Sequence, residues 1–226
     1  MGEIIEFASN GTSAQGYLAT EGTGPGVVVI QEWWGLVDHI KELCDRFAAQ
    51  GFVALAPDLY HGAAASLQEP NEAGKLMMAM RLEQAAEDMS GAVDAVKARC
   101  SSRGVGVVGF CMGGGLALVL ACQRPDLVKA VAPFYGLIPW ADAQPDYSKL
   151  EAAVQGHFAE NDDSAGPKAA RELEDTLTRQ GKRARMYIYP GTQHAFFNDQ
   201  RPEVFDATAA REAWEKLLPF LRDELH

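Results

Sequence analysis

The sequence has few cysteines, no long apolar run and a shortage of basic side chains. Its four cysteines are scattered and none belongs to a Cys-x-x-Cys pair, which argues against a disulfide framework and a zinc site. No uninterrupted run of about eighteen apolar residues occurs, so no membrane-spanning helix is expected. Twenty Lys and Arg against thirty-one Asp and Glu give a net charge of −11, which disfavours nucleic acids and anionic membranes as partners.

The overall composition is typical of a globular protein. Hydrophobic residues make up 47% of the 226 and charged residues 23%, so we expect a sizeable core in a single domain over residues 1–226. The opening segment MGEIIEFASNGTSAQG has neither the basic nor the apolar part of a secretory signal. We therefore expect a cytoplasmic protein that is monomeric, with an oligomer left open, and whose partner is a small-molecule substrate.

Short apolar runs alternate with helical patterns along the chain. Apolar residues at helical spacing occur at 40–48, 173–177 and 210–221. The alternation predicts an α/β fold with a mainly parallel sheet and helices on both faces. Residues 4–7 and 14–19, joined through an Asn-Gly turn, predict an antiparallel hairpin at one edge. Runs rich in β-branched and other apolar residues predict the buried strands, at 26–30, 52–57, 105–109, 129–134, 153–159 and 185–190.

One cysteine lies in the stretch VVGFCMGGG, where a predicted strand turns into a predicted helix. Gly-Phe-Cys-Met-Gly has the G-x-S-x-G spacing of a nucleophile elbow, with Cys111 in place of serine. Gly109 and Gly113 allow the strand and the helix to approach closely, and a helix N-terminus favours the reactive thiolate. The backbone N–H of Met112 is placed to bind a developing oxyanion.

The alternatives for this turn are a buried cysteine and a phosphate-binding loop. A Walker loop needs Gly-Lys-Ser/Thr after the glycines and a dinucleotide loop needs G-x-G-x-x-G, and neither pattern is present. Cys44 and Cys122 lie on apolar helical patterns, where a cysteine usually acts as a small hydrophobic residue. Cys111 is therefore our candidate nucleophile.

A nucleophile on such an elbow needs an acid and a base further along the chain. The histidines after the elbow are His157, His194 and His226. His157 lies within a predicted strand, which favours a packing role, whereas His194 follows a strand and is our candidate base. The loop AENDDSAGP, after the preceding strand, offers Glu160, Asp162 and Asp163. We choose Asp162 as the acid, with Asp163 as the alternative.

The early loop QEWWG directly follows the predicted strand 26–30 and belongs to the same site. The backbone N–H of Trp33 is expected to supply a second oxyanion donor. Glu32 is expected to face the Cys111 sulfur, so that the two groups titrate as a coupled pair. A surface position for Glu32 and plain packing for Trp33 and Trp34 are the alternatives.

Together these motifs make the sequence similar to the dienelactone hydrolase family, a cysteine-using branch of the α/β-hydrolases. The matching segments cover nearly the whole chain and are QEWWGL, APDLYHG, VGFCMGG, HFAENDD and YPGTQHAFFND. The resemblance implies an α/β-hydrolase fold with no large lid, and Cys111, Asp162 and His194 as nucleophile, acid and base. It also implies that Glu32 pairs with the thiol at rest and is displaced by substrate. The implied reaction is hydrolysis of a lactone such as 4-carboxymethylenebut-2-en-4-olide to maleylacetate.

The chain departs from the family pattern where a substrate carboxylate would be held. The best-known members place Ser directly after the catalytic His and Arg shortly beyond it, whereas this chain reads Ala-Phe-Phe-Asn at 195–198. The family's other carboxylate-binding Arg, upstream of a long helix, has no counterpart. Arg81, which we place inside that helix, and Arg201 are speculative replacements. We expect a more apolar pocket that includes Trp34, Tyr135 and Phe196.

We therefore expect a cysteine hydrolase of lactones or carboxylic esters that works through a thioester and needs no cofactor or metal. A general carboxylesterase or thioesterase acting on a more apolar substrate is the alternative within this chemistry. A non-hydrolytic thiol sensor is the alternative outside it. Reversible oxidation of Cys111 without turnover of any ester would distinguish the sensor.

Overall fold

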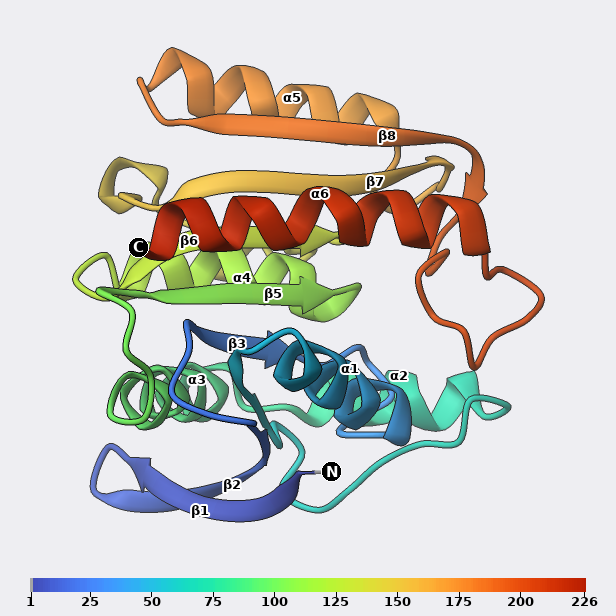
Figure 1. Cartoon of the computed structure of the whole chain (residues 1–226). Coiled ribbons are helices and arrows are strands. Elements are labelled where there is room, and N and C mark those ends of the chain that lie inside the picture. Colours follow the sequence, from blue (N-terminus) through green and yellow to red (C-terminus); the bar gives the residue numbers. More distant parts are fainter. Residues whose placement is uncertain (1) are drawn as a thin grey trace.

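The computed structural model describes residues 2–226, in which eight strands form one sheet of order β1-β2-β4-β3-β5-β6-β7-β8 (Figure 1). β1 pairs antiparallel with β2 at one edge, β2 pairs antiparallel with β4, and all further pairings are parallel. The predicted α/β fold with an N-terminal antiparallel hairpin is thus confirmed. The strands are β1 (Glu3–Ser9), β2 (Thr12–Ala19), β3 (Gly26–Ile30), β4 (Val53–Pro57), β5 (Val105–Phe110), β6 (Val128–Phe134), β7 (Ala153–Asn161) and β8 (Ala184–Gln193).

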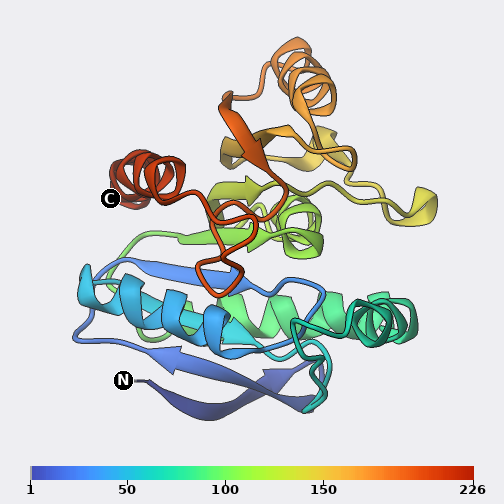
Figure 2. The same ribbon diagram turned by 90° about the vertical axis from the view of Figure 1, so that its right-hand side faces the viewer.

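Helices cover both faces of the sheet. α1 (Asp38–Ala49) and α6 (Ala207–Leu225) pack on one face, and α3 (Leu82–Lys97), α4 (Met112–Gln123) and α5 (Pro167–Arg179) pack on the other (Figures 1 and 2). α2 (Pro70–Ala79) precedes α3, and two short 3-10 segments, Ala141–Ala143 and Tyr147–Lys149, follow β6. Among residues 2–226, no helix combines the length and the apolarity that crossing a bilayer requires.

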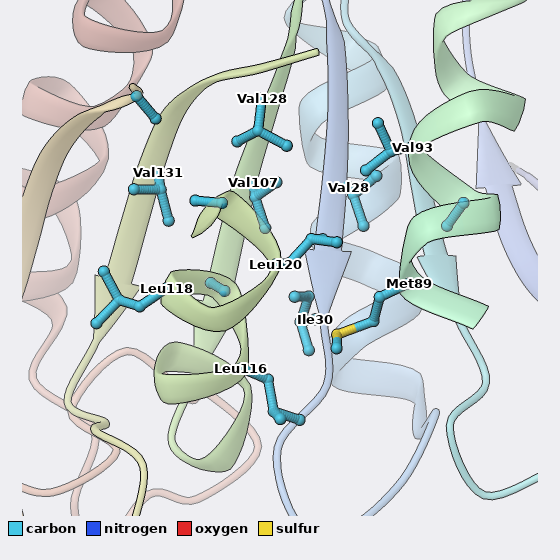
Figure 3. Packing of buried hydrophobic residues seen from close by; sticks show 14 of the residues in the cluster. Val28, Ile30, Met89, Val93, Val107, Leu116, Leu118, Leu120, Val128 and Val131 are labelled. Carbon is cyan, nitrogen blue, oxygen red and sulfur yellow. The ribbon is translucent and has the colours of Figure 1, made fainter. Parts of the chain in front are cut away.

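The central strands are buried because both faces of the sheet are covered. Every residue of β3, β4 and β5 is buried, which explains why these strands read as continuous apolar runs in the sequence. Figure 3 shows Leu116 and Leu120 of α4 and Met89 of α3 packed over Val28 and neighbouring strand residues. Burial of each such side chain contributes about 1.5–3 kcal/mol to folding.

The region between β4 and β5 differs from the expectation of one long helix with Arg81 inside it. Met80 and Arg81 have extended backbones, with ψ of 127° and 108°, so α2 ends and α3 begins there. Arg81 is the N-cap of α3 rather than an interior residue. The break leaves α2 as a separate short helix, and its residue Met77 lines the cavity described below.

The loops that follow the parallel strands collect at one edge of the sheet. Parallel strands place their carboxyl ends together, and ligands of open α/β sheets bind at that edge. Figure 2 views the molecule from the side toward which these strands run. The loops after β3, β5, β7 and β8 carry the predicted site residues and therefore converge there.

Candidate active site

Cys111 occupies the turn between β5 and α4, as the elbow pattern predicts. Its backbone lies in the left-handed region, with φ 54° and ψ −120°, a conformation that costs a non-glycine residue about 1–3 kcal/mol. Close backbone packing enforces the turn: a Cβ on Gly109 would overlap the carbonyl of Gly113, and one on Gly136 would overlap that of Cys111. The turn places Cys111 at the N-cap of α4, where the helix dipole favours negative charge.

Asp162 and His194 come together because they follow adjacent parallel strands, β7 and β8. His194 Nδ1 lies 2.7 Å from Asp162 Oδ2. The other carboxylate oxygen, Oδ1, accepts hydrogen bonds from the backbone N–H of Ser164 at 2.8 Å, from its hydroxyl at 2.7 Å and from the N–H of Ala165 at 3.1 Å. The Asp162 side chain is 1% exposed and that of His194 is 32% exposed, so a buried carboxylate holds an imidazole that reaches the surface of the site.

The electrostatics of this pair favour the charged form of both groups. Burial lowers the pKa of His194, but the hydrogen bond to Asp162 and the adjacent Cys111 sulfur outweigh it and raise that pKa to about 10. Burial raises the pKa of Asp162, but His194 and the donors of Ser164 outweigh it and lower that pKa to about 2. At neutral pH the pair is therefore an imidazolium bound to a carboxylate.

The competing acids and histidine lie in different environments. Asp163 and Glu160 are exposed, and Glu160 accepts a hydrogen bond from the N–H of Gly191 at 2.9 Å. His157 is fully buried between Tyr189, whose hydroxyl is 2.7 Å from its Nδ1, and Gln155. Burial lowers the pKa of His157 to about 3, so it is a neutral packed histidine, as its position within a strand predicts.

The loop after β4 contacts both residues that are expected to supply oxyanion donors, Trp33 and Met112. Met112 is the first residue of α4, so its N–H has no acceptor within the helix. The Tyr60 hydroxyl donates to the carbonyl of Trp33 at 3.1 Å and lies 3.6 Å from Met112 Sδ. Gln31 Oε1 accepts the N–H of Leu59 at 3.2 Å, so the segment before Trp33 is tied to the same loop. Sequence reasoning missed the role of Tyr60, although this residue lies in the family-matching segment APDLYHG just after the end of a strand.

Glu32 is 1% exposed and is therefore not a surface acid. Its Oε1 accepts the Tyr135 hydroxyl at 3.3 Å and its Oε2 accepts the Asn198 side-chain amide at 2.8 Å. Burial, followed by the charges of Glu32 and Cys111, raises the pKa of Tyr135 well above its ordinary value, so the phenol is a neutral donor. The expected pairing of Glu32 with the Cys111 thiol stays a prediction, since Tyr135 and Asn198 engage the carboxylate here.

A cavity of about 200 Å³ opens beside the cysteine and the imidazole. Tyr135 lines it, as expected from the sequence. Trp34 and Phe196 lie elsewhere: Trp34 is 3% exposed in a cluster with Ala65 and Ala73, and Phe196 is fully buried against Tyr135 and Tyr189. Phe196 supports the cavity from behind through Tyr135. Its lining consists of Met77, Cys111, Met112, Tyr135, Gly136, Leu137, Ile138, Pro139, Ser164, Ala165 and His194.

The other cysteines provide a contrast with Cys111. Cys44 is fully buried and Cys122 is 4% exposed. Burial raises the pKa of both thiols, that of Cys122 to about 11, so both stay protonated and unreactive at neutral pH. Cys111 is half-buried and lies at the catalytic edge of the sheet, where an ester carbonyl can reach it.

Comparisons with known proteins identify the family of this chain. Residues 14–225 match the model of the Dienelactone hydrolase family. Protein usf of Aquifex pyrophilus is 39% identical over 237 aligned positions, and "Putative carboxymethylenebutenolidase" of Aquifex aeolicus is 37% identical over 235, each alignment covering 100% of both chains. A crystal structure from Klebsiella pneumoniae, "Putative Dienelactone Hydrolase", superposes with a TM-score of 0.86 at 24% identity and covers 98% of each chain. The chain belongs to the dienelactone hydrolase family of hydrolases.

Proposed function

We propose that this protein hydrolyses lactones or carboxylic esters with Cys111 as the nucleophile and a thioester as the intermediate, in the manner of a carboxymethylenebutenolidase. The observation that carries the proposal is the alignment of three groups at one edge of the sheet. Cys111 stands at the N-terminus of α4, His194 lies beside it, and Asp162 is 2.7 Å from the imidazole. The same constellation serves acyl transfer in other hydrolases.

The first half-reaction forms the thioester. The Cys111 sulfur attacks the carbonyl carbon, and the oxyanion accepts hydrogen bonds from the N–H groups of Met112 and Trp33, each typically worth about 3–4 kcal/mol. The bond between the carbonyl carbon and the leaving oxygen then breaks, while the new carbon–sulfur bond of the thioester remains. The leaving oxygen takes the proton of the His194 imidazolium, which the raised pKa of His194 keeps available at neutral pH. In a lactone the leaving oxygen stays tethered to the acyl group.

The second half-reaction uses the same imidazole as a base. Acylation of the Cys111 sulfur removes one of the causes that raise the pKa of His194. The pKa of His194 therefore falls in the acyl-enzyme, and the neutral imidazole accepts a proton from water. The hydroxide attacks the thioester, the carbon–sulfur bond breaks, and the carboxylic acid leaves. Asp162 keeps the imidazole oriented throughout.

Hydrolysis of enol-lactones and aryl esters by the wild-type protein and its Cys111→Ala and His194→Ala variants tests the proposal. We expect each variant to lose about 10³-fold or more in kcat/KM, because nucleophile and base act as a unit. Cys100→Ala, which removes a thiol at the far end of α3, is the matched control and should retain full activity. Mass spectrometry of quenched wild-type reactions should detect the acyl group on Cys111.

Undiminished turnover in Cys111→Ala would refute the cysteine mechanism. A protein that turns over no ester or lactone, yet oxidises reversibly at Cys111, would be a thiol sensor instead. The paired His194 and Asp162 argue for hydrolysis, because a redox role needs neither a general base nor a residue to orient it.

A further inference from the structure

We propose that the acyl group accepted by this site is uncharged and apolar, so that neutral short-chain esters and lactones are its substrates and carboxylate-bearing ones are not. This inference rests on the cysteine mechanism of the proposed function, and it replaces the carboxylate-bearing lactone of a carboxymethylenebutenolidase with a neutral substrate. Three observations support it: the residues that line the cavity beside Cys111, the positions of Arg81 and Arg201, and the hydrogen-bond partners of Asn198.

Apart from the catalytic groups, most of the cavity lining consists of apolar side chains. Met77 comes from α2, Met112 from the start of α4, and Leu137, Ile138 and Pro139 from the loop after β6. No Lys or Arg belongs to the lining in the described part of the chain. An apolar acyl chain gains free energy by leaving water for such a surface, whereas a carboxylate loses its hydration without gaining a partner.

Two arginines, Arg201 and Arg81, are the sequence candidates to replace the missing carboxylate-binding arginines. Both lie away from the catalytic cavity. Arg201 Nε donates to Glu203 at 2.9 Å, and its guanidinium lies over the Trp34 ring, 5.8 Å from the centroid. Arg81 lines a separate cavity of about 450 Å³ together with Thr12 and other residues, and that cavity contains neither Cys111 nor His194. Neither cation reaches the wall of the catalytic cavity.

Asn198 lies shortly beyond His194, in the stretch where the best-known relatives carry an arginine, and its side-chain amide already has partners within the protein. The side chain is fully buried. Its Nδ2 donates to Glu32 at 2.8 Å, and its Oδ1 accepts the N–H of Gln200 at 3.1 Å. Among the described residues of the cavity lining, the one cationic side chain is the His194 imidazolium, and Asp162 already pairs with it at 2.7 Å. A substrate carboxylate would therefore find no free counter-ion among them.

A matched pair of esters tests the inference, p-nitrophenyl butyrate and the p-nitrophenyl monoester of succinate. They share the leaving group and the chain length, and differ in a terminal methyl against a terminal carboxylate. We expect kcat/KM for the butyrate to exceed that for the succinate by at least about 100-fold, because the carboxylate enters without a partner. Equal or faster hydrolysis of the succinate would overturn the inference and leave the cysteine mechanism intact. Loss of both activities would refute the proposed function itself.

Two neighbouring variants on α2 provide a second, independent measurement. Met77→Arg places a cation on the cavity wall, whereas Met78→Arg places the same cation on the adjacent position, which is 72% exposed. We expect Met77→Arg to raise the succinate-to-butyrate ratio of kcat/KM by about 10-fold through charge complementarity, and Met78→Arg to leave it unchanged. An unchanged ratio in Met77→Arg, with circular dichroism like that of the wild type, would count against the inference.

Discussion

Asp162 is the residue on which the chemistry of the imidazole depends. It accepts one hydrogen bond from His194 and three from the loop that follows it, and it is almost fully buried. Burial alone would lower the pKa of His194, and only the charges and hydrogen bonds around it reverse this effect. The raised pKa of His194, and with it the supply of a proton to the leaving group, therefore depends on the Asp162 carboxylate together with Cys111.

Asp162→Asn should lower kcat by about 10²–10⁴-fold, because an amide neither stabilises the imidazolium nor selects its productive tautomer. In the same variant the pKa of His194 should fall from about 10, since burial then opposes a weaker partner. An NMR titration of the imidazole measures the shift directly. Asp163→Asn, next in the chain and exposed, is the control and should change neither quantity. An unchanged His194 pKa in Asp162→Asn would contradict this assignment.

At the scale of the elements, two neighbouring loops act as a unit. The loop after β3 carries Glu32 and Trp33, and the loop after β4 holds it through Tyr60 and Gln31. The Tyr60 hydroxyl donates to the Trp33 carbonyl and lies 3.6 Å from Met112 Sδ, so it links the two residues whose N–H groups are the expected oxyanion donors. Tyr60 touches no reacting atom in this arrangement and is a positioning residue.

Tyr60→Phe should lower kcat by about 3- to 10-fold, the worth of one hydrogen bond of about 0.5–1.5 kcal/mol, with KM nearly unchanged. The effect falls on kcat because the oxyanion develops only in the transition state. Tyr147→Phe is the matched control, because Tyr147 lies beside Cys122 at the opposite end of α4. This variant should leave both kcat and KM unchanged. A rise in KM with unchanged kcat would show instead that Tyr60 serves substrate binding.

Some features of the elements can be predicted from the sequence, and others cannot. Strand and helix patterns predict the elements because apolar spacing records which faces are buried, and the elbow glycines predict the turn at Cys111 because only close packing requires them. The break at Met80 and the role of Tyr60 could not be predicted. Both depend on contacts between segments far apart in the chain, which leave no local pattern. For the same reason the prediction that Trp34 and Phe196 line the cavity is wrong, since both are buried outside its lining.

At the scale of the whole molecule, the catalytic pair also contributes to folding, because two separate loops meet only when the sheet is complete. His194 has a native pKa raised to about 10 from 6.5, so its stabilising contribution is full below pH 6.5 and is lost as the pH rises through 10. Asp162 has a native pKa lowered to about 2 from 3.8, so its contribution is full above pH 3.8 and is lost as the pH falls through 2. The pair therefore stabilises the fold most between these two limits.

Urea unfolding of the wild type and of Asp162→Asn across the pH range measures this contribution. We expect the difference in the free energy of unfolding to be greatest between pH 3.8 and 6.5, and to shrink toward pH 2 and toward pH 10. Taking the difference cancels the titration of the other acidic groups of this chain, whose net charge is −11. The curve for Asp163→Asn should run parallel to that of the wild type. A difference that stays constant with pH would mean that Asp162 stabilises the loop only through its neutral contacts, and that the ion pair with His194 contributes nothing to the fold.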